Sequence, residues 1–79
     1  MLTEHIPLPP MGALLYVDHG NYAHARNEFR FGLCMRVPAS GGGFSFPPTV
    51  LAHYGSMYMA VQAHAELEKR VRIYAVLTS

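Results

Sequence analysis

The strongest structural signal in the chain is the alternation of side chains over residues 28–37. The odd positions are all apolar, and the even positions carry charged, glycine or cysteine side chains, as at Glu28, Arg30 and Arg36. A period of two residues is typical of a β-strand with one face against a core and the other face in water. A shift by one residue would bury two arginines, so the pattern predicts a strand with a well-defined register.

Weaker patterns predict further strands. Residues 12–17 favour a strand that ends at the turn-forming residues 18–21, and residues 71–77 favour a last strand. Residues 22–27 fit either a short helix or a continuing hairpin, and we expect the hairpin. The three glycines at positions 41–43 predict a mobile hairpin tip. Residues 44–46, Phe-Ser-Phe, would follow it as a short strand with both rings on the core face.

Between residues 49 and 69 the pattern becomes helical. Gly55 would weaken the middle of such a helix by about 1 kcal/mol relative to Ala. Two interpretations therefore remain: one long helix, or a break at Gly55 followed by a shorter helix that Ser56 caps. On a helical wheel the apolar side chains gather in one arc of about 120°, which contains Val50, Leu51, Tyr54, Met57, Tyr58, Val61 and Ala65.

Together these elements predict an α+β fold: a small antiparallel sheet of three to four strands with one helix packed on one face, in the order β-β-(β)-α-β. Residues 1–10 contain three prolines and are expected to form an extended tail. Residues 11–79 are expected to form a single domain. The predicted core consists of Leu15, Val17, Phe29, Phe31, Leu33, Met35, Tyr54, Tyr58, Val61, Ile73 and Ala75.

The chain is too short for more than one small domain, and it carries few charges. Charged residues make up 14% of its 79 residues, against about 25% in ordinary soluble domains, and the net charge is only +1. A net charge this small excludes an acidic mimic of nucleic acid and a basic histone-like protein. So few charges cannot cover the surface of a small domain, and we therefore expect a protein partner or a homodimer.

Three features predict a cytoplasmic protein that does not cross a membrane. The longest uncharged apolar run, residues 11–17, is far shorter than the roughly 20 residues that a membrane span needs. The first ten residues lack the basic start of a signal peptide. Cys34 is the only cysteine, so the chain cannot form an internal disulfide.

No combination of residues predicts catalysis or a metal ion. His53 and His64 lie 11 residues apart, about 16 Å along a helix, which is too far for two ligands of one zinc ion. His19 and His24 flank a turn, but no second pair of ligands is spaced to join them. Cys34 lacks the neighbouring base and oxyanion hole that a catalytic nucleophile requires. We therefore expect a protein that is not an enzyme and that binds no metal ion or cofactor.

The polar face of the predicted sheet is the first candidate binding surface. It would combine Glu28, Arg30 and Arg36 of the long strand with Arg72 and Tyr74 of the last strand, if these two strands are neighbours. Arg and Tyr are enriched at protein interfaces, so a protein partner is the first interpretation. RNA-binding sheets also combine basic and aromatic side chains, which makes nucleic-acid binding the alternative, although a net charge of +1 supplies little affinity for phosphates.

The outer side of the predicted helix is the second candidate surface. It would carry Gly55, Met59 and Arg70, with little charge along most of its length. A sparsely charged helix surface is a second place where a protein partner or another copy of the chain would bind.

In its size, its lack of a catalytic motif and its pattern of one helix on a sheet, the chain resembles small accessory proteins of phages and mobile elements, including anti-CRISPR proteins. The resemblance covers the whole chain as an organisation, and no residue motif carries it. It implies a non-enzymatic inhibitor that occludes a surface of a bacterial effector complex in the host cytoplasm. The chain departs from the acidic DNA-mimicking members of that group, because its net charge is +1.

Overall fold

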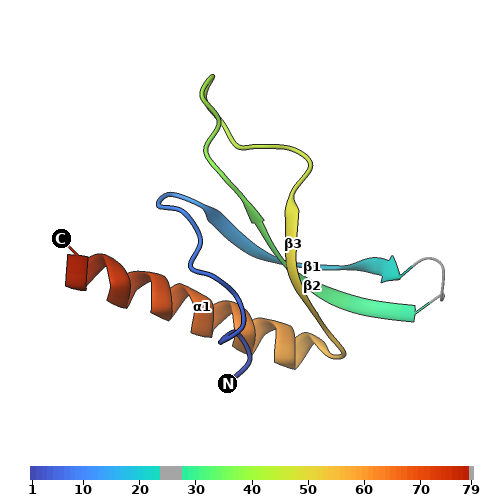
Figure 1. The fold of residues 1–79 in the computed structure, drawn as a ribbon. Helices are drawn as coiled ribbons and strands as arrows, with labels where there is room; N and C mark the ends of the chain where they lie inside the picture. The colour runs from blue at the N-terminus through green and yellow to red at the C-terminus, as the bar shows by residue number, and fades with distance from the viewer. Residues whose placement is uncertain (24–27, 79) are drawn as a thin grey trace.

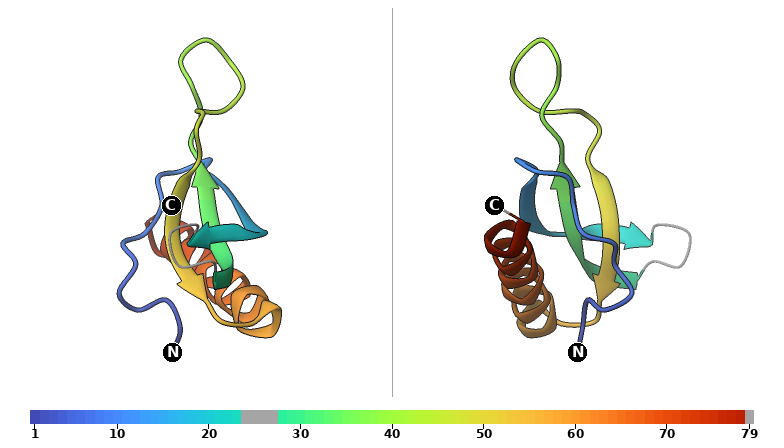
Figure 2. Two further views of the ribbon diagram at one scale, coloured as in Figure 1. Left: turned by 90° about the vertical axis from the view of Figure 1, so that its right-hand side faces the viewer. Right: turned by 60° about the vertical axis from the view of Figure 1, so that its left-hand side comes forward.

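The computed structural model describes residues 1–23 and 28–78, with side chains described for residues 1–18 and 31–78 (Figure 1). The described part of the chain forms three strands followed by one helix: β1 (Leu14–Ala23), β2 (Glu28–Arg36), β3 (Thr49–Tyr54) and α1 (Met57–Thr78). The strands form an antiparallel sheet in the order β1-β2-β3, and α1 lies across one face of it (Figures 1 and 2). The predicted α+β fold class is confirmed.

The long central strand β2 forms where the alternation predicts it. It pairs with both neighbours, so that Val17 and Ala52 lie on either side of Leu33. Directly paired residues share a face of an antiparallel sheet, and Leu33 is fully buried against α1. The alternation therefore fixes which face of β2 meets the helix, as expected. Of residues 22–27, the first two belong to β1, and residues 24–27 lie outside the described part of the chain.

The helix begins at Met57, which confirms the shorter of the two predicted helices. Ser56 caps the helix. The Ser56 hydroxyl accepts a hydrogen bond of 3.2 Å from the backbone N–H of Met59. The Ser56 carbonyl accepts a hydrogen bond of 3.1 Å from the backbone N–H of Ala60. Residues 49–54 form β3 instead of a first helical turn. Gly55 separates the two elements, as its low helix propensity favours.

The helix then continues to Thr78, so the predicted last strand over residues 71–77 is wrong. Val71 and Ala75 extend the stripe that begins at Ala60, Ala63 and Leu67 with spacings of three and four residues, and those three residues are buried. Residues 57–78 contain neither glycine nor proline to end the helix. A short alternating segment at the end of a nucleated helix is extended as helix, because each added residue gains one backbone hydrogen bond.

The buried cluster differs from the predicted core chiefly in which side of α1 it uses. Leu33 and Tyr54 are buried as predicted, whereas Tyr58, Val61 and Ile73 are exposed on the helix. Alanines line the buried side instead, because small side chains let the helix lie close to the sheet. The cluster consists of Ile6, Leu33, Tyr54, Ala60, Ala63 and Leu67, with Leu2, Leu15, Val17, Phe31, Leu51 and Ala52 partly buried against it.

The first residues of the chain pack onto the domain where an extended tail was expected. Thr3 and Ile6 are buried, and the N–H of Ile6 closes a turn on the carbonyl of Thr3 at 2.9 Å. The segment crosses α1 on its way to β1 (Figure 1). The prolines beyond Ile6 keep residues 7–10 out of the sheet, as predicted.

Candidate functional site

The predicted Arg and Tyr patch does not form on the sheet. Arg72 and Tyr74 lie on α1, not on a strand beside β2, and both are exposed there. Arg36 lies in β2, where its register places it on the face away from α1. The backbones of Glu28 and Arg30 lie in β2, and their side chains are outside the described part. This surface was predicted in the wrong place because residues 71–77 were predicted as a strand and instead belong to α1.

The second predicted surface is also divided. Gly55 precedes the helix and Met59 lies exposed in its first turns, whereas Arg70 points to the segment that covers another side of α1. The Arg70 Nη1 group donates a hydrogen bond of 2.6 Å to the carbonyl of Thr3. Ala63, which lies between Met59 and Arg70 along the helix, is fully buried. These residues do not form one surface.

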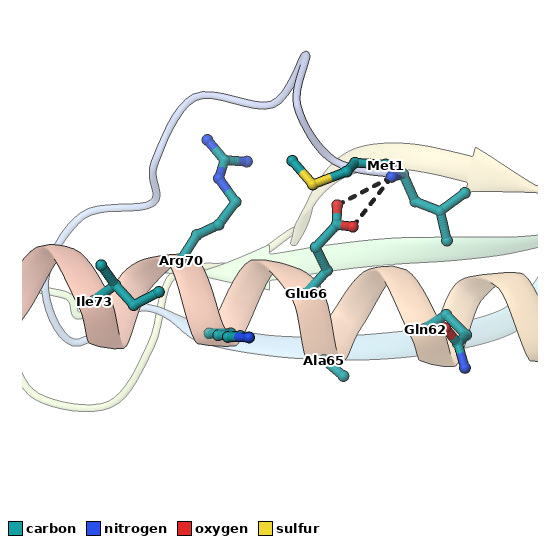
Figure 3. A pocket seen from close by; sticks show the side chains of 8 residues that line it. Met1, Gln62, Ala65, Glu66, Arg70 and Ile73 are labelled. Atoms are coloured by element: carbon teal, nitrogen blue, oxygen red, sulfur yellow. Dashed lines mark hydrogen bonds between the residues drawn. The ribbon is translucent and has the colours of Figure 1, made fainter.

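Arg70 belongs to a cluster that holds the start of the chain on α1. The Glu66 carboxylate accepts hydrogen bonds from the backbone N–H groups of Leu2 at 3.0 Å and Thr3 at 2.7 Å, and from the Thr3 hydroxyl. The Tyr54 hydroxyl donates to the carbonyl of Leu2 at 2.9 Å. Glu66 and Arg70 point to the same side of the helix, whereas Ala65 points away from it (Figure 3).

The cluster perturbs two titrating groups. The hydrogen bond from the Thr3 hydroxyl, followed by those from the Thr3 and Leu2 backbones, holds the pKa of Glu66 below its ordinary value. Burial raises the pKa of Tyr54, and the nearby Glu66 carboxylate raises it further. Both shifts arise from burial, hydrogen bonds and charges within the fold.

The segment between β2 and β3 contains an ordered projecting hairpin, residues 37–46 (Figures 1 and 2). The N–H of Ser45 donates to the carbonyl of Val37 at 2.7 Å, and the Ser45 hydroxyl accepts from the N–H of Val37 at 3.1 Å. The tip turns through Gly42 and Gly43, whose φ angles of +92° and +68° suit glycine. The predicted hairpin tip is therefore present, with its own set of hydrogen bonds.

Phe46 and Arg36 form an exposed pair at the base of this hairpin. Phe46 is 83% exposed and Phe44 is 41% exposed, so the prediction that both rings face the core is wrong. The Arg36 Nε group donates to the carbonyl of Ser45 at 2.8 Å, and the guanidinium carbon lies 5.9 Å from the centre of the Phe46 ring. That distance is within the range of a cation–π contact. Pro47 and Pro48 prevent a regular strand from continuing past Phe46.

The face of the sheet away from α1 is less polar than predicted. Cys34, which was expected to be partly exposed, is fully buried there between its cross-strand neighbours Tyr16 and Val50. Burial raises the pKa of the Tyr16 phenol above its ordinary value of 10.0. This face therefore lacks the reactive thiol that an exposed cysteine would present.

A broad apolar surface covers the side of α1 opposite its alanines. Its four large members are Tyr58 (73% exposed), Val61 (52%), Ile73 (49%) and Val76 (75%). At 100° per residue they lie within about 120° of one another. We call this surface the outer face of α1; it also carries Gln62, Ala65, Lys69 and Arg72, all exposed.

Three comparisons with known proteins add no family to this description. No family model matches the chain, and no curated protein or solved structure is significantly similar to it. Within the described residues, no group of three or more His, Cys, Asp or Glu side chains is arranged to hold a metal ion. No helix in this part of the chain is long and apolar enough to cross a membrane.

Proposed function

We propose that this protein is a non-enzymatic, cytoplasmic binding protein that acts by occluding a surface of another protein. A bacterial effector complex is the kind of target that its resemblance to anti-CRISPR proteins suggests. The observation that carries the proposal is the Phe46 ring, which is 83% exposed on a hydrogen-bonded hairpin. The exposed ring presents apolar surface to water, and burial of that surface by a partner is favourable.

The Phe46 and Arg36 pair has the properties of an interface anchor. Aromatic and arginine side chains supply much of the binding energy at protein interfaces. Here the Ser45 carbonyl fixes the Arg36 guanidinium at 2.8 Å, and the guanidinium contacts the ring. Such an arrangement loses little conformational entropy on binding, which favours affinity.

The same pair indicates the chemistry of the partner. Phe46 requires an apolar pocket that accepts one phenyl ring. The Arg36 guanidinium has five N–H donors. Its Nε group contacts Ser45 O, and Nη2 lies 3.4 Å from Phe44 O. The other N–H groups would donate to a carbonyl or carboxylate at the rim of that pocket. Because the chain has a net charge of only +1, shape and apolar contact would dominate recognition over long-range attraction.

The alternative function, nucleic-acid binding through an Arg and Tyr sheet face, has little support. That interpretation required Arg72 and Tyr74 beside β2, and both lie on α1. Arg36 lies in β2, on the face of the sheet away from α1. A protein partner is therefore the function that we propose.

Site-specific photo-crosslinking tests the proposal. The protein is made with a photoreactive phenylalanine analogue at position 46, incubated in a bacterial lysate and irradiated. We expect one predominant adduct, which an excess of unlabelled wild-type protein abolishes and an excess of Phe46→Ser does not. Leu8→Ser, which alters an exposed apolar residue of the N-terminal segment, should compete like the wild type. No adduct, or equal competition by Phe46→Ser, would overturn the proposal.

A further inference from the structure

The outer face of α1 points to an assembly of two copies. We infer that a second copy of this chain binds the outer face of α1, so that two α1 helices pack antiparallel about a two-fold axis. This inference is independent of the protein that the 37–46 hairpin contacts. It rests on the surface area of the chain, on the location of its exposed apolar side chains and on their spacing along the helix.

The chain exposes more surface than a monomer of its mass normally does. Its accessible surface is 5410 Å² for 8.8 kDa, whereas the usual scaling with mass gives about 4,800 Å². The excess of roughly 600 Å² is comparable to the ~800 Å² that each partner buries in a standard protein interface. The molecule is also thin, with extents of 44 × 33 × 16 Å. One interface per copy would bring its burial into the normal range.

The exposed apolar side chains are concentrated on α1. Of the fifteen large apolar side chains that are exposed in the described part of the chain, eight lie on this helix, and four of these eight form its outer face. The sheet covers the alanine side of α1, and Glu66 and Arg70 hold the N-terminal segment beside the outer face, where Met1 and Leu2 share a pocket with Gln62, Ala65, Lys69 and Ile73 (Figure 3). Tyr58, Val61 and Val76 do not line that pocket and are exposed. The outer face is therefore accessible to a second helix.

The spacing of these side chains is self-complementary. In a two-fold interface, residue i of one copy meets residue j of the other, and residue j meets residue i. Tyr58 and Val76 are centred on position 67 of the chain, and so are Val61 and Ile73. A single antiparallel register therefore places the members of each apolar pair at the same level along the two helices, at both ends of the interface. Ala65 lies near the axis, where its small side chain lets the helices approach closely.

The charges of α1 favour the antiparallel arrangement. In this register Lys69 meets Ala65 of the second copy and Arg72 meets its Gln62, and the long basic side chains can extend to water while their stems cover apolar surface. A parallel two-fold pair would instead place each basic residue against its own copy. Glu68, at the margin of the face, is already bonded within the helix by His64 at 3.3 Å and by Arg72 at 4.0 Å.

A charge exchange between the paired positions 61 and 73 tests this register. By size-exclusion chromatography with light scattering, we expect wild-type protein at twice the 8.8 kDa of one chain. Val61→Glu and Ile73→Lys should each raise the dissociation constant of the dimer at least about tenfold, because each buries an unpaired charge. The double variant should restore the dimer, since the new carboxylate at position 61 of one copy then meets the new ammonium group at position 73 of the other.

Two controls accompany these variants. Met59→Glu introduces the same charge on α1 but off the outer face, so it should leave the dimer unchanged. Circular dichroism must show the wild-type helix content in every variant. A wild-type mass of 8.8 kDa at all concentrations, or a double variant that remains monomeric, would overturn the dimer. Crosslinking at position 46 is measured separately. If the protein is a monomer but still forms the adduct that excess wild-type protein abolishes, only the dimer is overturned. If the protein is a dimer but forms no adduct, only the proposed function is overturned.

Discussion

Single residues show where the free energy of folding comes from and where surface is left for binding. Leu33 is fully buried between the sheet and α1, whereas Phe46 projects into water. The Glu66 carboxylate accepts three hydrogen bonds from residues 2 and 3, more than sixty positions away in the chain. Alternation within a strand predicts residues such as Leu33. It cannot predict Glu66, because a contact between distant segments leaves no periodic signal.

Leu33→Ala is expected to lower the free energy of unfolding by about 2–5 kcal/mol, because it removes buried methyl groups and leaves a cavity. Leu14→Ala is the matched control, since Leu14 lies on the neighbouring strand β1 and is exposed; its effect should be well under half as large. Urea unfolding followed by circular dichroism measures both values. Equal losses would show that Leu33 is not in the core.

Glu66→Gln should produce a stability difference that depends on pH. Hydrogen bonds hold the pKa of Glu66 below its ordinary value of 4.5, so the charged carboxylate stabilises the fold above that value. This contribution is lost as the pH falls from 4.5 through the lowered pKa of the folded state. The wild type should therefore exceed the variant in unfolding free energy at neutral pH, and the gap should shrink in acid.

Urea titrations at a series of pH values measure this gap. Glu68→Gln is the control, because Glu68 lies on the same helix and forms its ion pairs with His64 and Arg72 of that helix. A gap for Glu66→Gln that is constant between neutral and acidic pH would contradict the role assigned to its carboxylate.

At the scale of elements, the sequence predicts β2 and the start of α1, but it misses β3 and the end of α1. The alternation of residues 28–37 locates β2, and Gly55 with Ser56 locates the start of α1. The helical wheel over residues 49–69 misleads about the buried side, because Val50, Leu51 and Tyr54 belong to β3 and so do not share the phase of the helix. Alanines then carry the packing, and alanine contributes little to a hydrophobic pattern.

The cap of α1 gives a prediction at this scale. Ser56→Ala should lower the free energy of unfolding by about 0.5–2 kcal/mol, because the N–H of Met59 loses its acceptor at the helix start. Ser40→Ala, at an exposed position of the 37–46 hairpin, should change it by less than about 0.5 kcal/mol. Thermal and urea unfolding of the two variants separate these outcomes. A neutral Ser56→Ala would mean that the cap contributes nothing to stability.

The whole molecule explains the shortage of charge in the sequence. A flat fold of 44 × 33 × 16 Å buries few of its apolar side chains. Of the fifteen large apolar side chains exposed in the described residues, four lie on the outer face of α1 and two on the 37–46 hairpin. The sequence predicts that apolar surface is left uncovered, but not where. The first predicted surface combined Arg36 with Arg72 and Tyr74 and depended on where α1 ends. The second combined Met59 with Arg70 and depended on which side of α1 faces the rest of the chain. Tertiary packing decides both.

The central claim is that Phe46 is the anchor by which this protein binds another. The most direct measurement is the affinity of wild-type protein and of Phe46→Ser for the protein that is captured at position 46, determined by titration calorimetry. An anchor residue contributes about 2 kcal/mol or more, so the variant should bind at least roughly thirtyfold more weakly while it unfolds at the same urea concentration. Equal affinities for the two proteins would contradict the claim.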